Sequence, residues 1–391
     1  MEISLYFEPV DFERIGFQPG EAKSRIGDLI EHPDEHFDED HLGEFDVVIF
    51  GVKEDRRSIN NEGTADAPDE IRKYLYRLSP GRKNLKIGDL GNILAGNEVD
   101  DTCFAVKSTV HRLLKSNTIP IILGGSQDLT YAAYLGFEEY ARVINLVSID
   151  AKFDNNRTED LPGSDSYLSK IIFRKPNFLF NYSNIGYQTY FIEPEELQLL
   201  DKLFFDAVRL GEVRNDIPET EPVIRNADFL TFDISSIRQS DAPGNGNASP
   251  NGFYGEEACQ LMRYAGLSSK LSCLGIFEVN PRYDQRGQTA HLAAQMIWYF
   301  FDGLTHRISD YPGDDKSGFL KYTVNASGHD NDFVFYKSKA TDRWWMQMPI
   351  SREKEKKLFR HIMVPCSYGD YAKACNNEIP DRWWKAYQKL M

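Results

Sequence analysis

Hydrophobic and polar positions along this chain form blocks that predict strands and helices in alternation. Short apolar runs typical of buried strands occur at 45–51, 119–123, 143–149, 184–186, 207–210, 229–233 and 271–278. Between them lie stretches with helical periodicity at 67–75, 106–114, 129–140, 194–203, 256–265 and 289–304. Strands separated by helices indicate βαβ units. We therefore expect an α/β fold of three αβα layers, with a mostly parallel sheet and helices on both faces.

The pattern is different at the N-terminal end. Residues 1–44 have no regular apolar period and are interpreted as a polar lead-in. The stretch 31–41 is dense in acidic residues and histidines. A solvated loop explains it better than a loose cation site, because nothing there fixes a ligand geometry.

Beyond residue 309 the chain is rich in aromatic residues. Runs at 319–325 and 333–337 predict a hairpin, and 342–348 predicts a further strand. The phrase Asp-Arg-Trp-Trp occurs twice, ending at Trp345 and at Trp384. We expect these tryptophan pairs to pack on the main body, the alternative being an exposed patch for a partner. The predicted division is a lead-in at 1–44, a main domain at 45–309 and a small α+β appendage at 310–391.

Composition narrows the class of protein. The 391 residues include 45 basic and 60 acidic side chains, a net charge of −15 that argues against a nucleic-acid or anionic-membrane partner. No signal peptide and no window of 18 apolar residues is present. The five cysteines are scattered, so we expect reduced thiols in a cytoplasmic protein, with a Cys366–Cys375 disulfide as the alternative.

Polar motifs follow four of the predicted strands. They are Gly124-Gly-Ser-Gln-Asp128, Asp150-Ala-Lys-Phe-Asp154, Asp233-Ile-Ser-Ser-Ile-Arg238 and Glu278-Val-Asn-Pro-Arg-Tyr-Asp284. In an open α/β sheet, ligands bind outside the carboxyl ends of the strands. We therefore expect these four motifs to meet in one site.

This set of motifs resembles the ureohydrolase family of arginases, agmatinases and formimidoylglutamases. The resemblance runs from about Asp46 to Gly303 and includes 63–72, 87–91 and Thr289-Ala290. It implies the arginase-like fold and relatives that usually form rings of three or six subunits. In that family, two manganese ions held by six side chains activate a bridging water, which attacks an amidine or guanidine carbon.

Carried over by motif, the resemblance assigns six ligand positions, of which three keep the family residue. Asp150, Asp154 and Asp233 match family aspartates, whereas Gln127 stands in place of a histidine. Lys152 replaces the histidine of Asp-Ala-His-x-Asp, and Ser235 replaces the second aspartate of Asp-x-Asp. In the family, both replaced residues are ligands of the second ion and not of the first. A two-manganese centre is therefore not expected, because an ammonium beside a divalent ion costs several kcal/mol, on the order of 4 per unit charge at 4 Å.

Two arrangements remain open for the rest of the site. Gln127, Asp150, Asp154 and Asp233 could hold one hard ion, Mn²⁺, Mg²⁺ or Ca²⁺, through oxygen atoms alone. Alternatively, Lys152 neutralises the three aspartates in a metal-free network, with Arg238 adding charge if its side chain turns inward.

Further roles follow from the resemblance. Glu278 matches the acid that contacts the substrate guanidinium in arginases, the alternative being a strand-end carboxylate that bonds locally. The loop after the second motif implies substrate contacts from Ser164, Asp165 and Ser166. That loop lacks the relay histidine of arginases, as it does in formimidoylglutamases. If catalysis survives, Lys152 and Glu278 are the expected catalytic residues.

Two functions follow. The first is a non-hydrolytic homologue, a binding or assembly protein with a degenerate metal site. The alternative is a formimidoylglutamase- or agmatinase-type hydrolase of a linear amidine or guanidine that uses at most one ion. In either case we expect a small amidine, guanidine or amino-acid ligand and a homo-oligomer, with residues 310–391 as a further partner surface.

Overall fold

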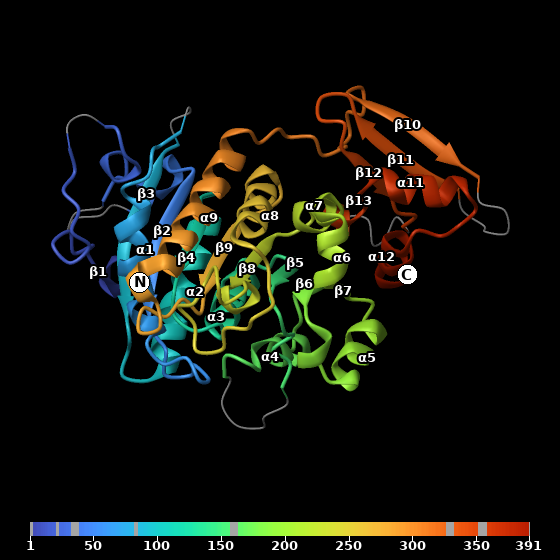
Figure 1. Cartoon of the computed structure of the whole chain (residues 1–391). Coiled ribbons are helices and arrows are strands. Elements are labelled where there is room, and N and C mark those ends of the chain that lie inside the picture. The colour runs from blue at the N-terminus through green and yellow to red at the C-terminus, as the bar shows by residue number, and fades with distance from the viewer. Residues whose placement is uncertain are drawn as a thin grey trace.

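A computed structural model of the chain describes residues 3–20, 23–32, 39–81, 85–156, 163–325, 332–350 and 358–390. In this part of the chain a large sheet flanked by helices forms the main body, and a smaller sheet lies at one end of it (Figure 1). None of the helices described is long and apolar enough to cross a membrane.

The large sheet has nine strands in the order β1-β3-β2-β4-β9-β8-β5-β6-β7. Within the described part of this large sheet, the short β1 pairs antiparallel with β3, and the other strand pairs are parallel. The predicted α/β fold with a mostly parallel sheet is confirmed. The strands are β1 Phe7–Glu8, β2 Val47–Lys53, β3 Ile87–Leu94, β4 Ile119–Leu123, β5 Ile144–Ile149, β6 Leu179–Tyr187, β7 Asp206–Arg209, β8 Phe229–Asp233 and β9 Cys273–Phe277.

Two hydrophobic cores lie on the two faces of this sheet. Neighbouring residues of a strand point to opposite faces, so Ile49 packs in one core and Phe50 in the other. The first core is covered by α1 Ala67–Leu75, α6 Leu210–Asn215, α7 Glu221–Arg225, α8 Gly255–Leu267 and α9 Gln288–Thr305. The second is covered by α2 Val99–Lys115, α3 Leu129–Glu139, α4 Tyr167–Phe173 and α5 Pro194–Lys202. Both faces are therefore buried, which explains why β2 and β4 are apolar along almost their whole length.

The N-terminal residues do not form a separate polar lead-in. Ile15 and Phe17 are buried in the first core, Ile3 is buried in the second, and β1 adds a strand beside β3. The sequence did not predict this packing, because the apolar residues there follow neither a helical nor a strand period. The boundary at residue 44 stays a prediction, and most of the acidic and histidine-rich stretch, residues 33–38, lies outside the described residues.

A buried ion pair joins α1 to β3. The Arg72 guanidinium is fully buried and donates to both carboxylate oxygens of Asp89 at 2.8 and 2.7 Å, and to Asn92 Oδ1 at 2.6 Å. Tyr76 also donates to Asp89, at 2.8 Å. The two early motifs, 63–72 and 87–91, thus contact each other, and they fix the helix on the sheet.

The appendage is a four-stranded antiparallel sheet in the order β10-β11-β12-β13, with two helices packed against it. Its elements are β10 Phe319–Val324, β11 Phe333–Ser338, β12 Trp344–Gln347, β13 Met363–Cys366, α11 Tyr368–Cys375 and α12 Asp381–Leu390. The predicted hairpin and third strand are present. All five cysteines are free, including Cys366 and Cys375, so the structure contains no disulfide between them.

The appendage is attached to the main body through α7 and its neighbourhood. The Arg225 guanidinium lies 4.6 Å from the Trp345 ring and donates to the carbonyl oxygens of Trp344 and Cys366 at 3.1 and 3.3 Å. Arg360 pairs with the buried Asp228 at 2.5 Å. Trp345 therefore packs on the main body as predicted, whereas Trp384 in α12 keeps 43% of its surface exposed.

Candidate active site

The strand order brings the four polar motifs together. β4, β9, β8 and β5 are consecutive neighbours in the sheet, although β4 and β5 are separated from β8 and β9 by a long stretch of sequence. Because all four run parallel, their carboxyl ends lie at one edge. β4 and β5 follow each other in the sequence, but in the sheet β9 and β8 lie between them. This edge is therefore a topological switch point.

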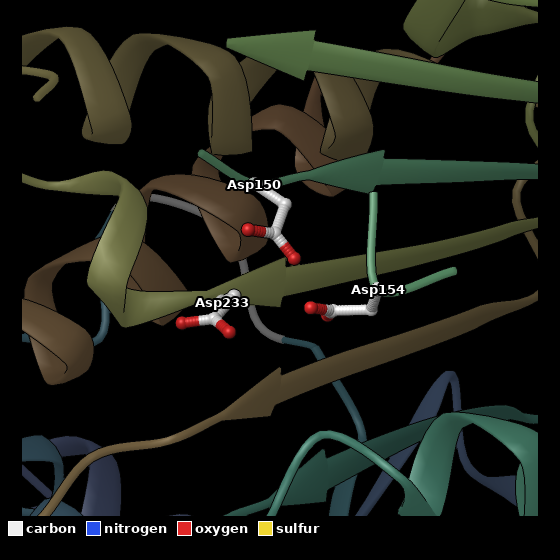
Figure 2. Close-up of side chains that lie close together, drawn as sticks. All are labelled: Asp150, Asp154 and Asp233. Carbon is white, nitrogen blue, oxygen red and sulfur yellow. The ribbon is translucent and has the colours of Figure 1, made fainter. Parts of the chain in front are cut away.

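Three aspartates form an acidic cluster at this edge (Figure 2). Asp150 follows β5, Asp233 ends β8, and Asp154 lies on the loop after β5, with ligand-type oxygen atoms all within 4.8 Å of one another. Asp150 Oδ1 accepts from the backbone N–H of Lys152 at 2.9 Å, and Asp233 Oδ1 accepts from that of Ser235 at 2.6 Å. These bonds orient two of the three carboxylates.

Burial and mutual repulsion disfavour three negative charges in this cluster. Desolvation raises the pKa of Asp150 and of Asp154 well above the usual range, and the charges of neighbouring aspartates raise both further. Desolvation also raises the pKa of Asp233. Asp150 Oδ2 and Asp154 Oδ2 are buried without a hydrogen-bond partner. A bound cation would remove both the repulsion and the missing contacts.

Gln127 brings a neutral oxygen to this edge of the sheet, on the loop after β4. Its side-chain amide nitrogen donates to Thr231 Oγ1 at 2.9 Å, and its backbone N–H donates to Glu278 Oε1 at 2.7 Å. Its Oε1 is therefore fixed in orientation, and it is buried without a partner. The residues present fit one hard cation, because Gln127 and the three aspartates offer only oxygen ligands.

Glu278 is held tightly behind the cluster. Its two oxygens accept from the Gln127 backbone and from Asn61 Nδ2, at 2.7 Å each, and its backbone φ is +67°. Desolvation, followed by the charge of Asp233, raises its pKa to about 8. Glu278 also lines the cavity described below. Glu278 therefore makes the local hydrogen bonds expected of a strand-end carboxylate, and it also borders the cavity. Its contact with a substrate stays a prediction.

The Lys152 ammonium forms no ion pair with the three aspartates in the described structure. Its Nζ lies 5.4 Å from the centroid of the Phe191 ring, and no ion pair within 4.0 Å joins it to the cluster among the residues described. Arg238 turns away as well, since it pairs with Asp241 at 2.8 Å and stacks on Tyr254. Although desolvation raises the pKa of Asp150, Asp154 and Asp233, the Lys152 charge lowers all three pKa values in part, so the metal-free arrangement stays an alternative to a single ion.

A polar cavity of about 460 Å³ opens onto the cluster. Ser164 and Asp165 line it, and their contact with a substrate stays a prediction. Ser166 is not part of the described lining, and its Oγ instead accepts from the backbone N–H of Gly163. The sequence interpretation missed several lining residues on the loops after β2 and β6, which are strand ends too. They are Ile59, Asn60, Tyr190 and Phe191, together with Glu196 in α5 and with Asn155, Asn156 and Asn247 elsewhere.

A larger cavity of about 570 Å³ lies near the C-terminal half of α9, lined by Ile26, Trp298 and Phe301 among other residues. It is mostly apolar and contains no cluster of carboxylates. The smaller polar cavity is therefore the better candidate for chemistry.

Comparisons with known proteins agree with this fold. A model described as the Arginase family matches residues 45–302. Curated formimidoylglutamases from Clostridium tetani and a Geobacillus species are 26% and 28% identical over 267 and 273 residues, each alignment covering 64% of this chain and 79% of the relative. Among solved structures, formimidoylglutamase from Bacillus subtilis aligns with a TM-score of 0.66 at 21% identity, over 74% of this chain and 95% of that one. Trypanosoma cruzi formiminoglutamase with Mn²⁺ aligns with a TM-score of 0.63 at 19% identity, over 68% of this chain and 95% of that one.

Proposed function

Because this chain belongs to the arginase family, whose model matches residues 45–302, we propose that it hydrolyses a C–N bond of a linear amidine or guanidine with one divalent cation. The observation that carries the proposal is that three side-chain oxygens at the ends of β4 and β5 are buried without a hydrogen-bond partner. These are Asp150 Oδ2, Asp154 Oδ2 and Gln127 Oε1. The formimidoylglutamases among the relatives give further support. From the sequence alone, the non-hydrolytic homologue is the first expectation and the hydrolase is the alternative. The relatives and the buried oxygens favour the hydrolase.

Asp150, Asp154 and Asp233 would hold the ion, with Gln127 as a neutral ligand. When bound, such an ion lowers the pKa of a coordinated water and polarises the carbon–nitrogen double bond. Mn²⁺ is the first ion to test, since it is named with the structure of the Trypanosoma cruzi relative. The positions of Lys152 and Ser235 offer neither imidazole nor carboxylate, which supports a single ion.

The other residues of the cavity would bind and orient the substrate. Glu278 fixes the Gln127 backbone and borders the space beside the aspartates, where its acidic group would attract an amidinium. Lys152 supplies an ammonium in the same wall and would bind an anionic group of the ligand. Ser164 and Asp165 lie in the lining with the aromatic pair Tyr190 and Phe191, and would contact the rest of the molecule.

A direct assay tests this function. Protein purified with Mn²⁺ is expected to release formamide from formimidoylglutamate, or urea from agmatine or arginine. Asp150→Asn should abolish the release, whereas Asp201→Asn on the exposed face of α5 is a matched control that should retain it. No turnover on this panel with Mn²⁺, Mg²⁺ or Ca²⁺ would contradict the proposal.

A second candidate is a non-hydrolytic protein that keeps the ligand cavity. The replacement of two family ligands by Lys152 and Ser235 favours it, because a single hard ion activates water less well than a pair. The two functions separate in one experiment. Calorimetric binding of an amidine ligand without any turnover, at saturating Mn²⁺, supports this candidate over the hydrolase.

A further inference from the structure

Lys152 has a fixed backbone and a side chain that can point in more than one direction. Its backbone N–H donates to Asp150 Oδ1 at 2.9 Å, and its carbonyl accepts from Asn184 Nδ2 at 2.7 Å. The residue thus starts next to the acidic cluster on a rigid turn. Its four-carbon stem allows the ammonium to reach either the cluster or the ring of Phe191 in the same cavity.

The structure shows the ammonium beside an aromatic ring of the cavity lining rather than in an ion pair with the aspartates. Its Nζ lies 5.4 Å from the centroid of Phe191, within the range of a cation–π contact. Phe191 ends the short helical turn Thr189–Phe191 after β6, and its ring meets that of Tyr190 edge-on at 4.7 Å. The ring is therefore supported, although 39% of the residue surface remains exposed.

The loop that carries Phe191 is tied to the loop that carries Lys152. The Gln188 backbone N–H donates to the carbonyl of Ala151 at 3.0 Å, and the rings of Phe153 and Tyr187 lie 5.2 Å apart. These contacts keep the aromatic ring at a set distance from the acidic cluster. The alternative position for the ammonium is among Asp150, Asp154 and Asp233, where a divalent ion would also bind and would repel it.

We propose that Phe191 is a positioning residue that holds the Lys152 ammonium on its ring and so leaves the acidic cluster open to a divalent ion. This inference rests on the proposed single-ion site. Without the ring, the ammonium turns toward the unpartnered carboxylate oxygens and competes with the ion. Phe191 thereby sets the affinity of a site that it does not contact.

The test is a calorimetric titration with Mn²⁺ of the full chain and four variants: Phe191→Leu, Lys152→Met, the double variant and Phe191→Tyr. A cation–π contact of about 0.5–2 kcal/mol corresponds to roughly 2- to 30-fold in affinity, so Phe191→Leu is expected to weaken Mn²⁺ binding by that factor. Lys152→Met removes the competitor, so binding should tighten and the additional Phe191 change should have no effect. Phe191→Tyr keeps an aromatic face and should restore the affinity of the unmodified chain.

Each other outcome overturns the inference. If Phe191→Leu leaves the affinity unchanged, or weakens it equally in the Lys152→Met background, the ring does not act through the ammonium. If the unmodified chain binds no Mn²⁺ while Lys152→Met does, the ammonium occupies the cluster despite the ring. If no variant binds Mn²⁺, the ion site itself is wrong and the proposed function fails with it. The first two results leave the ion-binding residues standing, so the two failures are distinguishable.

Discussion

Replacing one carboxylate of the acidic cluster should stabilise the protein when no metal is present. The side chain to change is Asp154, because its Oδ2 has no partner and its backbone has a φ of +50°. Asparagine has nearly the same shape and also tolerates this left-handed conformation. Asp154→Asn therefore removes a charge with little other disturbance.

The magnitude follows from the geometry of the cluster. Two unit charges 4.8 Å apart, the largest separation between these oxygens, repel by about 3.5 kcal/mol at an effective dielectric near 20. Asp154 takes part in two of the three pairs. Protonation limits the cost, since keeping a proton at pH 7 on a carboxyl with an unfolded pKa of about 3.9 costs about 4 kcal/mol relative to the unfolded chain. We expect a gain of about 2–4 kcal/mol at pH 7.

The sign of the pH dependence follows from the raised pKa of Asp154. A carboxyl with a raised folded-state pKa destabilises the protein above its unfolded pKa, so stability falls as the pH rises. The gain from asparagine should consequently be smaller at pH 5 than at pH 7. Mn²⁺ should reverse the order of stabilities, because the ion stabilises only a chain that binds it.

The assay is guanidinium denaturation in EDTA and then in saturating Mn²⁺. Asp201→Asn, on the exposed surface of α5, controls for the loss of one charge and should change stability by no more than about 0.5 kcal/mol. An Asp154→Asn protein that is less stable than the unmodified chain in EDTA would refute the repulsion argument.

Three further predictions concern the site, the core and the appendage. The double change Lys152→His and Ser235→Asp restores both ligand types of the second ion, so metal analysis should find two Mn²⁺ per chain instead of one; a value that stays at one contradicts the assignment of these positions. Arg72→Met leaves Asp89 buried without its charge partner and should lower the free energy of unfolding by about 3–5 kcal/mol in denaturant titration, whereas a loss below about 1 kcal/mol would show that the pair is dispensable. Burial lowers the pKa of Lys389 to about 8, so above that pH the folded chain binds fewer protons than the unfolded chain. Its stability relative to Lys389→Met should therefore rise by up to about 1.4 kcal/mol per pH unit between pH 8 and 10. A difference in stability that does not change with pH would refute the lowered pKa.

The sequence by itself determined the layered fold. Apolar strand runs separated by amphipathic helices specify a parallel sheet buried on both faces, because each element must cover its apolar surface. It also identified the polar strand ends, since ligands of an open α/β sheet bind outside the carboxyl ends of its strands. The N-terminal packing of Ile15 and Phe17 escaped this reasoning, because isolated apolar residues without a period match no element.

The tertiary structure decided which strand ends meet and where each side chain points. Only the sheet order places Asp150 beside Asp233, from strands far apart in the chain, and adds the loop with Phe191 to the same cavity. The sequence showed that Lys152 lies between two aspartates, and charge alone would pair them. Its ammonium lies on an aromatic ring instead, since a long flexible side chain follows the contacts that its neighbours in space offer, and these are set by packing rather than by position in the sequence.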